Sequence, residues 1–190
     1  MVKHRLNKYL KWWPLLIGPT SMILVYIAFY FDKLRFVDKA ANENIALILL
    51  GIAAANFALQ TAIYKKSFIL FMLCLTAAFF CREWHFPGTG KGIYIALACL
   101  VFWAFKQKNE FEKYIGPSRF RIWLIATFAA YLFSQLIARR VFRYIYLPYE
   151  DPLHIYLEET AETAAHLMML AASFALWPIA AKNSKSNSQS

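Results

Sequence analysis

A short acidic stretch in the C-terminal third of the chain carries the residues best suited to chemistry. Glu158, Glu159 and Glu162 are followed by His166. In a helix, Glu159, Glu162 and His166 fall within about 60° of one another, so two carboxylates and an imidazole share one face. A carboxylate beside an imidazole can exchange a proton with it, and both groups bind metal ions. Glu159, Glu162 and His166 are therefore the candidate catalytic residues, with either glutamate as the acid or base.

Arginines stand at the ends of two other apolar segments. Guanidinium groups bind phosphate and carboxylate groups through paired hydrogen bonds, so these arginines are candidates for binding an anionic lipid or solute. The four candidates are Arg82, Arg139, Arg140 and Arg143. The residues after the last of them are polar and aromatic, and we expect them to line the same pocket. They are Tyr144, Tyr146, Tyr149, Glu150, Asp151, His154 and Tyr156.

Three interpretations of this polar cluster stand side by side. In the first, arginines neutralise Glu159 and Glu162 and hold the helices together. In the second, the arginines bind an anion, with Arg82 as the clamp. In the third, a divalent metal is held by carboxylates and imidazoles on facing helices. Its ligands would come from Glu83, His85, Glu159, Glu162 and His166. A cofactor is expected only in the third case, and whether the protein is an enzyme stays open.

The elements that position these residues are long apolar segments. The chain has 190 residues, of which 60% are hydrophobic and 17% charged, too little polar surface for a soluble globule. Continuous apolar runs near bilayer length predict helices, because a helix satisfies its own backbone hydrogen bonds in lipid. The predicted spans cover about 15–31, 44–64, 67–84, 92–105, 121–137 and 159–181. The fold class is thus all-α: six transmembrane helices in one bundle, with a single domain over 1–182 and a disordered polar tail over 183–190.

The distribution of charge predicts the orientation of these spans. With six spans, one side of the membrane receives 13 Lys and Arg residues and 2 acids, and the other receives 8 and 9. Because cytoplasmic loops carry the excess of Lys and Arg, both termini are expected in the cytoplasm. The net charge of +10 then reflects insertion, and nucleic acid is not an expected partner. The short loops favour a bacterial cytoplasmic membrane.

Two local features bear on packing. Gly18 and Pro19 lie inside the first predicted span, where a kink or local break is expected. Cys74, Cys81 and Cys99 lie within spans; the first two, about 10 Å apart along one helix, are too distant for a disulfide and are interpreted as small buried groups.

The sequence thus predicts a small integral membrane protein with a structural, accessory or binding role, centred on a polar pocket on the outer side. Its partners are the lipid bilayer and, on this interpretation, other membrane proteins or an anionic lipid. The alternative is a membrane-embedded enzyme or small transporter that acts on an anionic or lipid-linked substrate at the Arg/Glu/His cluster.

Overall fold

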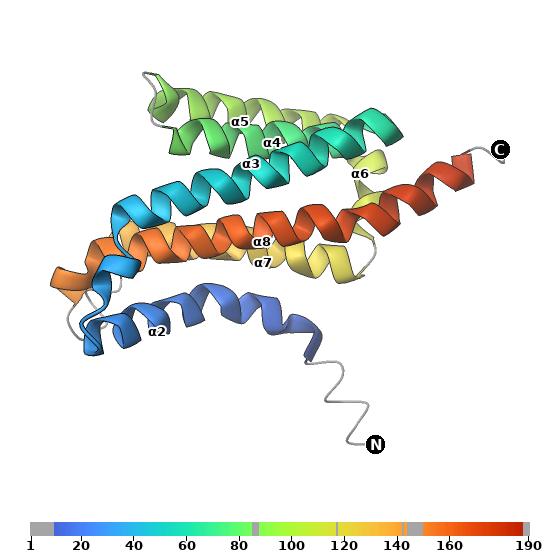
Figure 1. Cartoon of the computed structure of the whole chain (residues 1–190). Coiled ribbons are helices and arrows are strands. Elements are labelled where there is room, and N and C mark those ends of the chain that lie inside the picture. Colours follow the sequence, from blue (N-terminus) through green and yellow to red (C-terminus); the bar gives the residue numbers. More distant parts are fainter. Residues whose placement is uncertain (1–9, 85–87, 117, 142, 144–149, 188–190) are drawn as a thin grey trace, which may run out of the picture. The chain divides into compact units, whose positions relative to one another are not determined.

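The structure is all helical, as the sequence predicts. The computed structural model describes residues 10–84, 88–116, 118–141, 143 and 150–187. It is 92% helical, and these described residues form no strand. In chain order the elements in Figure 1 are η1 (Leu10–Leu16), α2 (Ile17–Tyr30), η2 (Leu34–Phe36), α3 (Lys39–Tyr64), α4 (Ser67–Glu83), α5 (Thr89–Lys106), α6 (Lys108–Ile115), α7 (Ser118–Ala138) and α8 (Glu150–Asn187).

Among the described residues, four stretches are long and apolar enough to cross a membrane. They are Trp12–Tyr30, Lys39–Tyr64, Phe120–Ala138 and Asp151–Ser184. Only 22% of the first stretch and 28% of the second are buried, so each stretch keeps many apolar side chains exposed or half-exposed. Helices with that much exposed apolar surface are compatible with a membrane protein. The third and fourth predicted spans correspond to α4, with 17 residues, and α5, with 18.

The chain divides into two compact units, and the single domain over 1–182 stays a prediction. The first unit comprises residues 1–46 and 122–168, and the second comprises 47–121 and 169–190. All three divisions fall inside helices, one each in α3, α7 and α8. Sequence could not reveal such divisions because an uninterrupted helix carries no linker composition to mark them.

Two helices begin earlier than the apolar pattern predicts, because their first turns are polar. α3 begins at Lys39 rather than near residue 44, and the Asp38 carboxylate caps it by accepting the Ala41 N–H at 2.8 Å. α8 begins at Glu150 rather than near 159, with Pro152 in its first turn, where the missing N–H costs no hydrogen bond. At its other end α8 continues to Asn187, so residues 183–187 of the expected tail are helical.

The first unit is held by close packing of α2 on α7. A Cβ placed on Gly18 would lie 3.5 Å from the Cα of Ala130, so the two helices approach closely there. The predicted local break lies just before Gly18, where the 3-10 helix η1 ends at Leu16 and α2 begins. Buried apolar side chains from α2, α7 and α8 form the core of this unit: Val25, Ile137, Leu153, Leu157 and Ala161.

The second unit contains an aromatic cluster that holds the short helix α6. The ring of Phe68 in α4 stacks on Tyr114 at a centroid distance of 4.9 Å and meets Phe111 edge-on at 5.0 Å. Burial raises the pKa of the Tyr114 phenol above its ordinary value, and the nearby Glu110 carboxylate adds to the shift. The phenol therefore stays protonated at neutral pH, which suits its place between aromatic rings.

A hydrogen-bonded network joins α3 to α8 within this second unit. The Asn56 amide donates to the Ser173 hydroxyl at 2.8 Å and accepts the Trp177 indole N–H at 2.7 Å. The fully buried Gln60 donates to the Ser173 carbonyl at 2.9 Å. Such bonds between apolar helices add both attraction and register.

Candidate functional site

The first unit has a polar pocket of about 400 Å³. It lies where α3 and α8 begin and where the chain leaves α7. The described residues that line it come from these three places: Asp38, Lys39, Ala40, Arg140, Asp151, Pro152, His154, Ile155 and Tyr156. A pocket of this size is within the range of small-molecule sites, which run from about 300 to 1,000 Å³.

The wall contributed by α3 is fixed by local hydrogen bonds. Besides the cap that Asp38 forms, the Asn42 side chain donates to the carbonyl oxygens of Val37 and Asp38 at 2.9 and 3.0 Å. The Asp38 cap satisfies an N–H group that a helix start would otherwise leave unpaired, and the Asn42 bonds tie the first turn of α3 to the residues before it. They also hold Lys39 on a rigid first turn.

Arg140 forms the wall contributed by the end of α7. Its backbone adopts the left-handed conformation, with φ of 53°, and its N–H closes the last turn by donating to the Ile137 carbonyl at 2.7 Å. Its Nη1 lies 3.1 Å from Oδ1 of Asp151, and Nη2 of Arg143 lies 3.9 Å from Oδ2 of the same carboxylate. The side chains of Arg140 and Asp151 are 45% and 65% exposed, so this pair stabilises the fold by only about 0–1 kcal/mol.

Lys39 links the pocket to the acidic stretch. Its Nζ lies 3.5 Å from the Glu43 carboxylate, in the next turn of α3, and 3.6 Å from the Glu159 carboxylate in α8. The partner of Glu159 is thus a lysine, where the sequence suggested an arginine. This ion pair joins α3 to α8 beside the pocket.

Polar side chains continue along α8 from the pocket toward the middle of the helix. Nε2 of His154 lies 3.7 Å from the Glu158 carboxylate, and the Thr163 hydroxyl donates to the Asn42 amide oxygen at 2.9 Å. Further along, Glu162 and His166 are 5% and 1% exposed. Burying ionisable groups inside a protein costs free energy unless they find partners, so Glu162 and His166 are retained as candidates for function.

His166 also packs against an aromatic ring of the first unit. Its imidazole lies 5.4 Å from the Tyr131 ring in α7, with the ring planes at 69°. Glu162 and His166 stand one turn apart on α8, and carboxylate and imidazole are both ligands that divalent metals accept. The metal hypothesis stays a prediction.

The remaining sequence candidates fall outside this pocket. Arg82 and Glu83 belong to the second unit, at the end of α4, with Nε of Arg82 3.9 Å from Oε1 of Glu83. Arg139 is exposed and is not among the described residues that line the pocket. His85 and the three tyrosines Tyr144, Tyr146 and Tyr149 lie outside the described residues.

Sequence reasoning missed the contribution of α3. The apolar segment begins near residue 44, whereas α3 begins at Lys39. The pattern therefore does not indicate Asp38, Lys39 or Asn42 as candidates. Two local signals could have marked this helix start. Asp38 is a residue type that commonly caps a helix, and Lys39 stands four residues before Glu43, the spacing of an ion pair along a helix.

Comparisons with protein-family models, with curated proteins and with solved structures found no match to this chain.

Proposed function

We propose that this protein is a binding or accessory component of a bacterial cytoplasmic membrane, with six spans and both termini in the cytoplasm. The observation that supports binding is the pocket of about 400 Å³ in the first unit, lined by charged side chains at helix ends. The excess of Lys and Arg on the side of the termini supports this orientation, in which the pocket lies on the outer side.

The chemistry of the pocket favours an anionic group with polar neighbours. Lys39 and Arg140 supply two cations, and the first turns of α3 and α8 add the partial positive charge of helix N-termini. Asp38 and Asp151 balance these charges, so an anion must compete with Asp151 for Arg140. A phosphate can do so because paired Arg–phosphate hydrogen bonds are strong, whereas the exposed Arg140–Asp151 pair is weak. The proposed ligand is thus a phosphate- or carboxylate-bearing headgroup, free or lipid-linked.

Binding can be tested with sn-glycerol 3-phosphate, which has the phosphate and glycerol of a lipid headgroup without acyl chains. The thermal unfolding midpoint of the purified protein in detergent, measured against probe concentration, reports the dissociation constant. We expect Arg140→Gln to weaken binding at least about tenfold, because a charge-assisted hydrogen bond is lost.

Arg139→Gln is the matched control for this experiment, since it removes the same charge from the neighbouring position. Binding should survive this change. Equal weakening by both substitutions, or a wild-type protein that the probe does not stabilise, would contradict the proposed site. Plain glycerol at the same concentrations reports any effect that does not involve the phosphate.

The second candidate function is an enzyme or small transporter acting on an anionic or lipid-linked substrate. The buried Glu162 and His166 favour it, because a carboxylate and an imidazole one turn apart can move a proton. Glu162→Gln removes the ionisable group and keeps the volume. If the wild-type protein releases phosphate from the probe, or carries it into liposomes, and Glu162→Gln binds without doing either, the catalytic or transport function is favoured over simple binding.

A further inference from the structure

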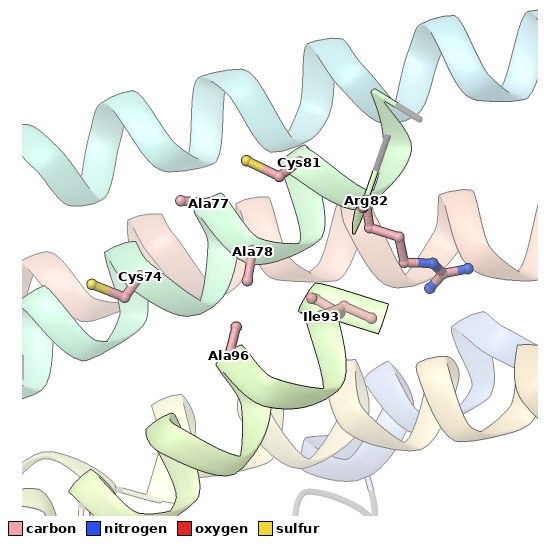
Figure 2. Close-up of a pocket in the computed structure, with 9 residues that line it drawn as sticks. Cys74, Ala77, Ala78, Cys81, Arg82, Ile93 and Ala96 are labelled. Atoms are coloured by element: carbon pink, nitrogen blue, oxygen red, sulfur yellow. The ribbon is translucent and has the colours of Figure 1, made fainter. Parts of the chain in front are cut away.

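A second cavity, in the other unit, has a different chemistry. It has a volume of about 440 Å³ and lies between α4 and α5. Small side chains line most of it, among them Ala78 and Ala96, which face each other across the gap in Figure 2. Cys74 and Cys81 also line it from α4, two turns apart. The result is an apolar slot between two neighbouring helices.

One end of this slot carries a positive charge. Arg82, in the last turn of α4, lines the slot together with Gly88 and Gly92, and Figure 2 shows its side chain extending past Ile93. Its side chain is 33% exposed. Nε of Arg82 lies 3.9 Å from Oε1 of Glu83, so an incoming anion would compete with this carboxylate for the guanidinium, which carries five N–H donors.

The surface around the slot is apolar and outward facing. On α5, Tyr94, Ile95, Val101, Phe102 and Phe105 are each more than half exposed. In the proposed six-span topology this surface faces lipid. A hydrocarbon chain then fills the slot more readily than water, because water there would lack hydrogen-bonding partners.

We propose that the slot between α4 and α5 binds one anionic glycerophospholipid, with an acyl chain along Ala78 and Ala96 and the phosphate at Arg82. The acyl chain alone confers little selectivity, since lipid tails are as apolar as the slot itself. Selectivity comes from the guanidinium, which binds an anionic headgroup at the membrane interface. This inference rests on α4 and α5 crossing the membrane, but not on the pocket of the first unit.

Native mass spectrometry of the delipidated protein in detergent can count bound lipid as phosphatidylglycerol or phosphatidylcholine is added. We expect one phosphatidylglycerol to bind at least about tenfold more tightly than phosphatidylcholine, and Arg82→Gln to abolish that preference. Ala96→Phe should remove the bound lipid for both headgroups by filling the slot.

Ala98→Phe is the control for added volume, because Ala98 is exposed on the same helix and does not line the slot. This variant should bind phosphatidylglycerol as the wild type does. The proposal would be overturned if Ala96→Phe bound as well as Ala98→Phe, or if the two lipids bound equally to the wild type. The thermal unfolding midpoint of each variant shows that it is folded.

The cysteines provide a second readout of where the lipid lies. Cys81 lines the slot, whereas Cys99 is exposed on α5 and does not line it. In single-cysteine variants, phosphatidylglycerol should slow alkylation of Cys81 by N-ethylmaleimide several-fold and leave Cys99 unaffected. Equal protection of both thiols would mean general coating by lipid and would overturn the assignment to the slot.

Discussion

Arg140 lines the pocket and has a backbone conformation that is unfavourable for a residue with a side chain. A left-handed conformation costs an L-residue other than glycine about 1–2 kcal/mol, and Arg140 adopts it at φ of 53°. Glycine is the usual residue for closing a helix in this way. Backbone strain of this kind clusters at functional sites, and the guanidinium of Arg140 lines the candidate pocket.

Arg140→Gly separates the conformational cost from the function. We expect this variant to raise the free energy of unfolding by up to about 1 kcal/mol, because relief of the backbone strain exceeds the loss of the exposed pair with Asp151. It should also lose binding of sn-glycerol 3-phosphate. The thermal unfolding midpoint with and without the probe measures both effects.

Lys65→Gly is the control for this prediction, since Lys65 has nearly the same backbone conformation, with φ of 50°, between α3 and α4. It should gain stability and keep the wild-type affinity for the probe. An Arg140→Gly protein that still bound the probe like the wild type would show that the guanidinium is not part of the site.

The packing of α2 on α7 depends on a residue without a side chain. At Gly18 a Cβ would meet Ala130 at 3.5 Å, an ordinary contact distance, so one methyl group fits and a larger side chain does not. The interface therefore accommodates alanine at position 18 but not a larger side chain.

Substitutions at Gly18 test this packing. Gly18→Ala should raise the free energy of unfolding by about 0.5–1 kcal/mol, since alanine favours the helix and fits the gap. Gly18→Leu should lower it by about 1–3 kcal/mol because the helices must separate. Thermal unfolding in detergent measures both. If the two variants were equally stable, α2 and α7 would not be in close contact in solution.

Hydropathy predicted where the helices lie, but not where a helix with a polar first turn begins. The centres of α4, α5 and α7 agree with the apolar segments, because lipid and the packed space between helices both favour apolar side chains. The first turns of α3 and α8 were missed because they are polar, and the pocket is built from those turns. The Lys39–Glu159 pair joins residues far apart in sequence, and which helices pack together cannot be derived from the local pattern.

The whole molecule can cross the membrane with four spans or with six, depending on α4 and α5. The four stretches that are long and apolar enough to cross a membrane do not include α4 or α5. The charge distribution, in contrast, favours six spans. The position that distinguishes the two topologies is the exposed Lys91, near the turn between α4 and α5.

Single cysteines in a cysteine-free chain decide between these topologies. With six spans, Lys91→Cys should react with a membrane-impermeant maleimide from the outer side of intact cells, as Asp32→Cys should. Lys108→Cys should react only after the membrane is opened. With four spans, Lys91→Cys would instead behave like Lys108→Cys. Asp32→Cys and Lys108→Cys are expected on opposite sides in either case, so labelling of both from one side would contradict both topologies.

The helix α8 is longer than a membrane crossing requires. Its 38 residues exceed the roughly 20 that cross a hydrocarbon core of about 30 Å, so in the proposed topology its polar first turns extend beyond that core. A long helix answers a change in bilayer thickness by tilting. Because the first turns of α8 form one wall of the polar pocket, we expect the width of that pocket to change with the thickness of the surrounding lipid.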